Sequence, residues 1–218
     1  MIEKLESDTE KGCVIVGTPG IGKTFFGLFY LFYLTRCHPQ SQIIWETFDT
    51  TWYVFLPSLR VKSGMLRQDD YFSITIFDKD AFYLTDSRIP MSNAFAYTLL
   101  FSSPRQERWN EFIKKDGVSL FYAPIWISDE IWILWREHWK KKMTADRVQE
   151  LLDWWGPIPQ TIFDKRNEEL DIEELTSKCN LKALIETMKF INGRLQYDDY
   201  NGKIIHIHPE LPNFKKNI

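Results

Sequence analysis

The residues best suited to chemistry lie near the start of the chain, in a glycine-rich stretch that follows a short apolar run. They are Gly17, Thr18, Pro19, Gly20, Ile21, Gly22, Lys23 and Thr24. They match the phosphate-loop pattern G-x-x-x-x-G-K-[ST], in which glycines let successive backbone N–H groups point at phosphate oxygens. In this pattern Lys23 reaches the β- and γ-phosphates and the Thr24 hydroxyl ligates Mg²⁺. The stretch therefore predicts a nucleotide site, and a chance glycine-rich turn is the less favoured interpretation.

A phosphate loop of this kind also needs a carboxylate near Mg²⁺, at the end of a neighbouring buried strand. Two aspartates qualify, because Asp78 follows residues 73–77 and Asp86 follows residues 82–85. The run before Asp78 alternates between apolar and polar residues, as in an edge strand, whereas the run before Asp86 is more continuously apolar. We therefore predict that Asp86, together with Thr24, binds the metal. For either aspartate the structural alternative is a turn at a strand end.

The segments around these residues alternate between strand and helix patterns. Strands are expected at residues 13–16, 42–47, 52–56, 72–76, 81–84 and 97–101. The helix after the loop contains an aromatic run, residues 25–34, that is apolar on nearly all sides, so we expect it to pack between the sheet and another layer. A second helix is expected after Ser103, because Ser103, Pro104 and Gln106 form a capping box. Strands that alternate with helices indicate an α/β fold with a mainly parallel sheet.

From about residue 128 the pattern becomes helical. Three tryptophans recur at helical spacing within residues 132–139, and a second apolar stripe stops at Gly156, which acts as a stop signal with the proline after it. Farther on, the pattern predicts a helix at residues 172–191 and a strand at residues 204–207. We therefore expect three parts: an α/β core at 1–127, a helical, lid-like extension at 128–195, and a short C-terminal strand and tail at 196–218.

The composition fits an ordinary globular protein without a general attraction to nucleic acid. The 218 residues include 27 Lys and Arg against 30 Asp and Glu, a net charge of −3. The three lysines at residues 140–142, beside the tryptophans, are better explained as the solvated face of a helix. Residues 1–11 contain no apolar signal-peptide region, and the apolar run at residues 25–34 is much shorter than the about 20 residues that span a bilayer. We therefore expect a soluble, intracellular chain with neither a membrane nor a nucleic acid as its partner.

Beyond the loop, the chain contains an ordered series of short motifs. They are residues 82–87, residues 100–104 with Glu107, Arg108 and Phe112, residues 124–126 with Asp129 and Glu130, and residues 155–159. Together with the loop they resemble the P-loop NTPase domain of Crinkler effector proteins, which is similar to that of trypanosome retrotransposon hot spot proteins. The resemblance covers about residues 10–165 and implies a P-loop ATPase core of the additional-strand type. It also implies that Asp86 is the acid associated with Mg²⁺ and that Ser103 is a phosphate-sensing residue after the next strand.

At two positions the chain departs from the pattern of that family. Gln160 stands where the resemblance implies an arginine that contacts phosphate, and Ser87, rather than an acid that activates water, follows Asp86. Candidate substitutes are Glu46 for the base and Arg105 or Arg108 for the phosphate contact.

Taken together, the residues and the resemblance predict an enzyme, a Mg²⁺-dependent ATP-binding NTPase that hydrolyses ATP slowly, with Lys23, Asp86 and Ser103 in catalytic roles. The alternative is a nucleotide-gated interaction module that binds ATP without hydrolysing it and changes shape for an unidentified protein partner. A small-molecule phosphotransferase is less favoured, because Arg136 and Arg147 are too sparse for an arginine-rich lid. A secreted effector, or a place in the host cell nucleus, is implied by the resemblance alone.

Overall fold

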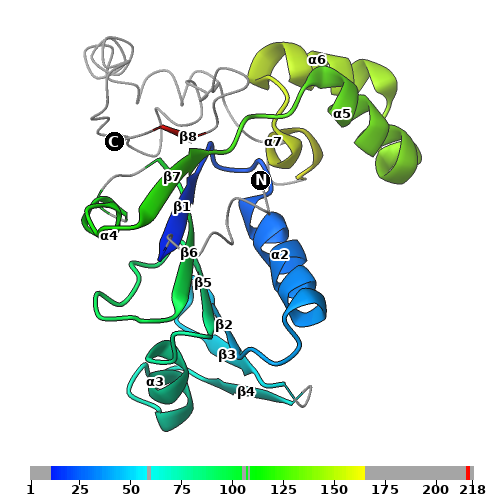
Figure 1. Ribbon diagram of the computed structural model, residues 1–218. Coiled ribbons are helices and arrows are strands. Elements are labelled where there is room, and N and C mark those ends of the chain that lie inside the picture. The colour runs from blue at the N-terminus through cyan, green and yellow to red at the C-terminus, as the bar shows by residue number, and fades with distance from the viewer. Residues whose placement is uncertain (1–10, 58–59, 105–106, 108, 165–214, 217–218) are drawn as a thin grey trace. The chain divides into compact units, whose positions relative to one another are not determined.

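The computed structural model of the chain describes residues 11–57, 60–104, 107, 109–164 and 215–216 (Figure 1). These residues form two compact units. An α/β unit contains those within Met1–Val16, Lys23–Tyr122 and Leu211–Ile218, and a helical unit contains those within Gly17–Gly22 and Ala123–Glu210. The phosphate-loop motif is divided between them, because its first six residues pack with the helical unit while Lys23 and Thr24 begin a helix of the α/β unit.

A mostly parallel sheet forms the centre of the α/β unit. Its strands are β1 (Gly12–Val16), β2 (Ile43–Glu46), β3 (Trp52–Phe55), β4 (Val61–Gly64), β5 (Phe82–Asp86), β6 (Tyr97–Ser102), β7 (Val118–Tyr122) and β8 (Lys215–Lys216). They are hydrogen-bonded in the order β4-β3-β2-β5-β6-β1-β7-β8. Strands β2, β5, β6, β1 and β7 are parallel, and β3, β4 and β8 pair antiparallel at the edges. The expected α/β fold with a mainly parallel sheet is therefore confirmed.

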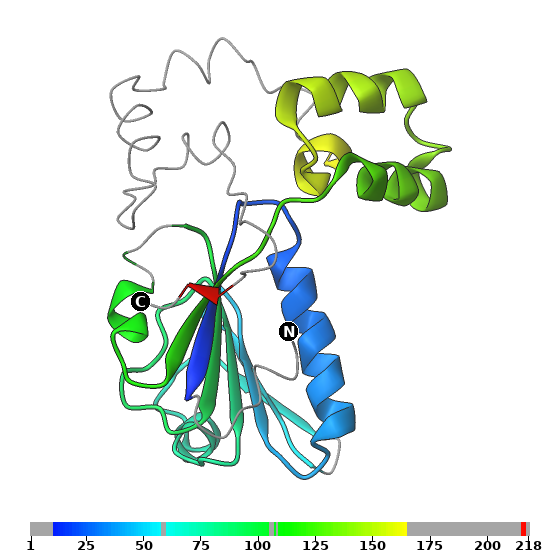
Figure 2. The same ribbon diagram turned by 45° about the horizontal axis from the view of Figure 1, so that its top comes forward.

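Helices cover both faces of this sheet (Figure 2). They are α2 (Lys23–Cys37), α3 (Asp70–Ile76) and α4 (Asn110–Ile113). On the α2 face the approach is close, since a Cβ at Gly27 would lie 2.7 Å from Trp45 and 3.0 Å from Phe101. The preceding residues of the same strands, Ile44 and Leu100, belong to the apolar clusters that contain residues of α3 and α4. Because successive strand side chains point to opposite faces, α3 and α4 lie on the face opposite α2.

The outer side of α2 differs from the expectation that this helix packs between two layers. The side chains that are buried on its sheet side are those of Tyr30, Leu31 and Leu34, next to Gly27. The side chains exposed on its other side are Phe25, Leu28, Phe29 and Phe32. A helix that is apolar all round contains no periodic signal to show which side is covered, so the sequence could not predict this exposure.

Residues 72–76, expected as an edge strand, form helix α3 instead. The Asp69 side chain caps the helix by accepting a hydrogen bond of 3.0 Å from the Tyr71 N–H. The buried residues of the helix are Phe72, Thr75 and Ile76. They are spaced i, i+3 and i+4, so they share one helical face although the short run also alternates. The expected strand was wrong because a run of five residues is too short to distinguish the two-residue period of a strand from the 3.6-residue period of a helix.

The helix expected to begin after Ser103 starts later than predicted, and Gln106 of the expected capping box lies outside the described residues. Pro104 lies in a bend, and α4 begins only at Asn110, after Trp109. Among the residues that the structure describes, none accepts or donates a hydrogen bond at the Ser103 hydroxyl. Strands β4 and β7 have no counterpart among the expected strands. The β4 sequence, Val-Lys-Ser-Gly, has no strand pattern, and its extended form is stabilised by pairing with β3.

The helical unit consists of short helices around an aromatic cluster. They are α5 (Ser128–Leu134), the π-helix η2 (Trp135–Trp139), α6 (Ala145–Trp155) and α7 (Pro159–Phe163). Ile131, Val148 and Ile162 are buried at the centre, and the tryptophans pack around them. This agrees with the helical pattern expected from residue 128, including the end of α6, where Gly156 has a φ of 69°. The helix expected at residues 172–191 and the strand expected at 204–207 lie outside the described residues.

No helix in the described part of the chain is both long enough and apolar enough to cross a bilayer.

Candidate functional site

The structure brings Thr24 and Asp86 together at the carboxyl edge of the sheet. Thr24 lies in the first turn of α2, and Asp86 is the last residue of β5, 62 positions later. The Thr24 hydroxyl donates a hydrogen bond of 2.8 Å to Asp86 Oδ2. The Ser87 hydroxyl donates one of 3.1 Å to Oδ1 of the same carboxylate. Asp86 is only 8% exposed, so these two bonds fix the orientation of a nearly buried carboxylate.

The strand register places Ser103 at the same edge. Val16, the last residue of β1, pairs with Ser102, and Asp86 pairs with Phe101. Ser103 therefore follows the strand that lies between the one leading into the loop and the one ending at Asp86. In open α/β sheets ligands bind outside this carboxyl edge. The phosphate-sensing role of Ser103 stays a prediction.

Ser87, which occupies the position of the implied acid, has an unusual backbone conformation. Its φ is 60°, in the left-handed region that residues other than glycine rarely adopt. A hydrogen bond of 2.7 Å from the Ser87 N–H to the Phe101 carbonyl holds it there. Strain of this kind costs about 1–3 kcal/mol and occurs preferentially at functional sites. Here it accompanies the bend that presents Asp86 at the end of β5.

Two opposing effects act on the ammonium group of Lys23. Burial lowers the pKa of Lys23 from 10.5 to about 8, and the nearby Asp86 carboxylate offsets part of this decrease. Loss of solvation makes the charged form costly, so an anionic ligand that approaches the ammonium would stabilise it. This is the environment expected of a lysine that binds phosphate.

We expect the affinity for Mg²⁺·ATP to fall as the pH rises above about 8. Without ligand Lys23 loses its proton around this pH, whereas bound phosphate would raise the pKa of Lys23. Binding above pH 8 then requires proton uptake, and the affinity should fall by up to about tenfold per pH unit. The free energy of unfolding should rise with pH between about 8 and 10.5, because the unfolded chain there holds more protons at Lys23.

Calorimetry at pH 7, 8 and 9 measures this dependence. Lys23→Met is the control, since it keeps a chain of similar length without a titrating group and should show no such fall. An affinity that does not change across this pH range in the wild type would contradict the assignment of Lys23.

The glycines of the loop adopt conformations that other residues avoid. The φ values of Gly20 and Gly22 are 84° and 96°, both in the left-handed region. At Gly17 the restriction is steric, because a Cβ would lie 2.7 Å from Ile21 Cδ1 and 3.0 Å from Ala123 Cβ. Each glycine of the pattern thus has a physical reason for its place.

Residues of the helical unit hold the loop through its carbonyl groups. Trp126 Nε1 donates a hydrogen bond of 3.0 Å to the Ile21 carbonyl. The backbone N–H of Gln160, in the first turn of α7, donates one of 3.3 Å to the Gly20 carbonyl. A Cβ at Gly20 would lie 2.9 Å from Gln160 Cβ. The residue that stands in place of the implied arginine therefore lies directly beside the loop.

Asp78, the alternative carboxylate, lies at the other end of β5. It belongs to the turn that precedes Phe82, where its N–H donates to the Thr75 carbonyl at 3.1 Å. Its side chain accepts a hydrogen bond of 2.9 Å from the Asp80 N–H. The turn-forming interpretation explains Asp78, and the carboxyl-edge position favours Asp86 as the acid associated with Mg²⁺.

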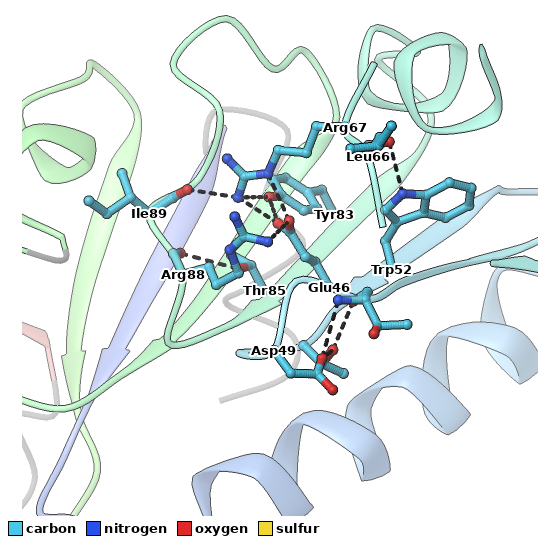
Figure 3. A network of polar contacts seen from close by, with 11 residues as sticks. Glu46, Asp49, Trp52, Leu66, Arg67, Tyr83, Thr85, Arg88 and Ile89 are labelled. Carbon is cyan, nitrogen blue, oxygen red and sulfur yellow. Dashed lines mark hydrogen bonds and ion pairs between the residues drawn. The ribbon is translucent and has the colours of Figure 1, made fainter. Parts of the chain in front are cut away.

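Glu46, the candidate base, is held by two arginines and a tyrosine (Figure 3). Arg67 forms a bidentate pair with it, with two bonds of 2.7 Å, and Arg88 Nη1 lies 3.0 Å from Oε1. The Tyr83 hydroxyl donates to Oε2. Burial and then the charge of Glu46 raise the pKa of Tyr83, so this hydroxyl keeps its proton. Both oxygens of the fully buried Glu46 are occupied, and the carboxylate is not placed to orient an attacking water.

The contacts of three residues, Arg67, Arg88 and Trp126, were not expected from the sequence. Arg67 and Arg88 lie in segments without a recognisable pattern, and only the position of Arg88, two residues after Asp86, could have drawn attention to it. Trp126 belongs to one of the motifs that resemble the Crinkler domain, but the motif does not indicate its contact with the loop. The other two candidate substitutes, Arg105 and Arg108, lie outside the described residues.

The groups available for Mg²⁺ are few. Within the described part of the chain, His, Cys, Asp and Glu side chains form no group of three or more that could hold a metal. Mg²⁺ does not need such a cluster, because proteins usually bind it through one or two side-chain oxygens together with substrate phosphates and water. The Thr24 hydroxyl and the Asp86 carboxylate offer two side-chain oxygens of this kind.

Comparison with known proteins finds a distant relative but no matching family model. No protein-family model matches the sequence. The chain is similar to Crinkler effector protein 15 of Phytophthora infestans, with 24% identity over 221 residues, which cover 95% of this chain and 34% of the relative. The chain thus spans about a third of the length of that relative. This similarity supports a relation to Crinkler proteins.

Proposed function

We propose that the protein is a Mg²⁺-dependent, ATP-binding P-loop NTPase that hydrolyses ATP slowly. The observation that carries this proposal is the hydrogen bond of 2.8 Å between the Thr24 hydroxyl and the Asp86 carboxylate. In P-loop proteins the corresponding two groups hold Mg²⁺, while the loop amides and the lysine bind the phosphates. Lys23 would neutralise charge on the transferring phosphoryl group, and Ser103 would sense the γ-phosphate.

The order of the strands supports a core of the additional-strand type. Strand β6 lies between β1, which leads into the loop, and β5, which ends at Asp86. One strand is thus inserted between the two strands that contribute to the site, and such an insertion is what defines this type. The positive φ values of Gly20 and Gly22 support the same proposal, because a phosphate loop needs them.

We expect slow hydrolysis because the residues at positions 160 and 87 lack the charge or the basicity that fast hydrolysis needs. Catalysis of phosphoryl transfer is mostly positioning and charge stabilisation, and an arginine at the transition state contributes about 10³–10⁵ in rate. Gln160, the neutral residue beside Gly20, cannot replace a guanidinium group. Ser87 is not an acid that could activate water, and the oxygens of Glu46 are already occupied. We therefore expect turnover well below the about 1–100 s⁻¹ of kinases.

The comparison of Asp86→Asn with Asp78→Asn tests the proposed site. Asp86→Asn removes the charge beside Mg²⁺, so we expect ATP to bind about 10- to 100-fold more weakly when Mg²⁺ is present, and nearly as before when it is absent. Asp78→Asn is the matched control, because it removes the same charge at the other end of the same strand and should leave both affinities near those of the wild type. Calorimetry with and without Mg²⁺ gives the four values. The opposite ranking would remove Asp86 from the site.

A second candidate function is a nucleotide-gated interaction module that binds ATP without hydrolysing it. The occupied carboxylate of Glu46 and the neutral Gln160 favour it, because neither supplies the base or the cation that hydrolysis needs. A turnover assay with purified protein distinguishes the two functions. ATP binding without turnover above the level of Lys23→Ala would favour the module, and tens of turnovers per second would exclude it.

The similarity to Crinkler effector protein 15 supports a proposal about setting, in which the chain is part of an effector that is secreted or acts in a host cell. The activity of the whole relative does not follow, since the chain spans about a third of it.

A further inference from the structure

The phosphate loop packs with the helical unit, and two consecutive peptide groups make the contact. The carbonyl of Gly20 accepts a hydrogen bond of 3.3 Å from the Gln160 N–H, and that of Ile21 accepts one of 3.0 Å from Trp126 Nε1. Ile21 itself is 7% exposed. At the next residue toward Lys23, Gly22, no described residue other than its two chain neighbours comes within 4 Å of the place where a Cβ would stand. Hydrogen bonds thus fix the loop at the carbonyls of Gly20 and Ile21, whereas the space beside the next residue, Gly22, is not filled by other described residues.

The orientation of these peptides decides where the donors of the loop point. In a trans peptide the C=O and N–H groups point in opposite directions. Because the Gly20 and Ile21 carbonyls point toward α7 and Trp126, the N–H groups of Ile21 and Gly22 point away from them. Successive N–H groups directed to one side form the concave anion site that phosphate oxygens occupy. Two hydrogen bonds from the helical unit therefore orient two donors of the loop.

We propose that Trp126 and the first turn of α7 are positioning elements that hold the loop ready for phosphate, so that the helical unit sets the nucleotide affinity. This inference rests on the proposed function as far as the ligand is concerned. An orientation that exists before binding raises the affinity, because the ordering of the loop is complete before the ligand arrives. By thermodynamic linkage, bound nucleotide stabilises the packing of Trp126 on the loop by the same factor. A partner that displaces Trp126 would release nucleotide, which is the behaviour of a gated module.

Trp126→Phe tests the proposal, with Trp135→Phe as a matched control. Trp126→Phe removes the N–H donor to Ile21 and keeps an aromatic ring in the cluster. Trp135→Phe removes a hydrogen bond of the same kind, from Trp135 Nε1 to the Met143 carbonyl at 2.8 Å, within the same cluster. The two readouts are the affinity for Mg²⁺·ATP and, without nucleotide, the hydrogen exchange of the loop amides, those of residues 17, 18 and 20–22.

We expect Trp126→Phe to weaken Mg²⁺·ATP binding about 5- to 10-fold and to accelerate loop exchange by a similar factor, while Trp135→Phe changes both less than twofold. Equal effects of the two variants, or unchanged loop exchange in Trp126→Phe, would overturn the positioning role. If the wild type binds no nucleotide but Trp126→Phe still accelerates loop exchange, the positioning role stands and the proposed function fails. The two failures are therefore distinguishable.

Discussion

Glu46→Gln should lower the free energy of unfolding by about 3 kcal/mol, the lower end of the range for breaking a buried ion pair. The substitution leaves the guanidinium groups of Arg67 and Arg88 without the carboxylate that now neutralises them. Glu46 is fully buried, whereas the side chains of the two arginines are 25% and 26% exposed. Water can therefore compensate part of the loss at the arginines, and for this reason we do not expect the upper limit of about 5 kcal/mol.

Glu150→Gln is the matched control for this prediction. Arg147 Nη1 lies 2.7 Å from Glu150 Oε2, as close as the bonds of the Arg67 pair, but the two side chains are 36% and 41% exposed. An exposed pair contributes about 0–1 kcal/mol, so this variant should change the free energy of unfolding by less than 1 kcal/mol. Urea denaturation gives both values. Equal losses in the two variants would mean that burial does not decide the strength of the Glu46 pair.

The nucleotide affinity and the turnover of Glu46→Gln show whether Glu46 has a structural or a catalytic role. If Glu46 only stabilises the carboxyl ends of the strands, Glu46→Gln should bind Mg²⁺·ATP as the wild type does. The comparison is made at a temperature at which the variant stays folded. The variant should also keep whatever turnover the wild type has. A large fall in turnover with unchanged stability would instead support the role of Glu46 as the base.

The parts of the fold and site that were predictable from the sequence are those set by local rules. The glycines, Lys23 and Thr24 form one continuous motif, so they can be read from neighbouring residues, although the contacts of the loop with Trp126 and Gln160 are distant in sequence. The position of Asp86 at the end of a buried parallel strand was also predictable, because a continuously apolar run marks a strand covered on both faces. Its role at Mg²⁺ stays a prediction.

The other parts depend on residues far apart in the chain, so no local pattern contains them. Glu46 meets Arg67 and Arg88 across separations of 21 and 42 positions, and Trp126 meets Ile21 across 105. The error at residues 72–76 has a different cause. There the pattern was ambiguous between two periods, and burial against Ile44 and Tyr83 decided for the helix.

Lys23→Ala should weaken Mg²⁺·ATP binding about 30- to 150-fold. A hydrogen bond from a charged group to phosphate contributes about 2–3 kcal/mol, and each 1.4 kcal/mol corresponds to about a tenfold change in Kd. The environment of Lys23 favours an effect of this size, because burial has already removed much of the hydration of its ammonium group, which lies near the Asp86 carboxylate. Lys62→Ala is the control, since Lys62 lies over the Tyr71 ring, 5.0 Å from its centre, and belongs to the edge strand β4.

We expect Lys23→Ala to stay folded, so that a loss of ATP binding in this variant can be distinguished from a loss of structure. Burial disfavours the charged form of Lys23, so its removal relieves a cost in the ligand-free protein while Asp86 keeps its bonds from Thr24 and Ser87. Circular dichroism and urea denaturation should therefore give values close to those of the wild type. If Lys23→Ala binds Mg²⁺·ATP as tightly as the wild type, the loop is not a phosphate site and the proposed function is wrong. If it unfolds, the effect on binding has to be judged from Lys23→Met, which keeps the aliphatic chain and removes only the charge.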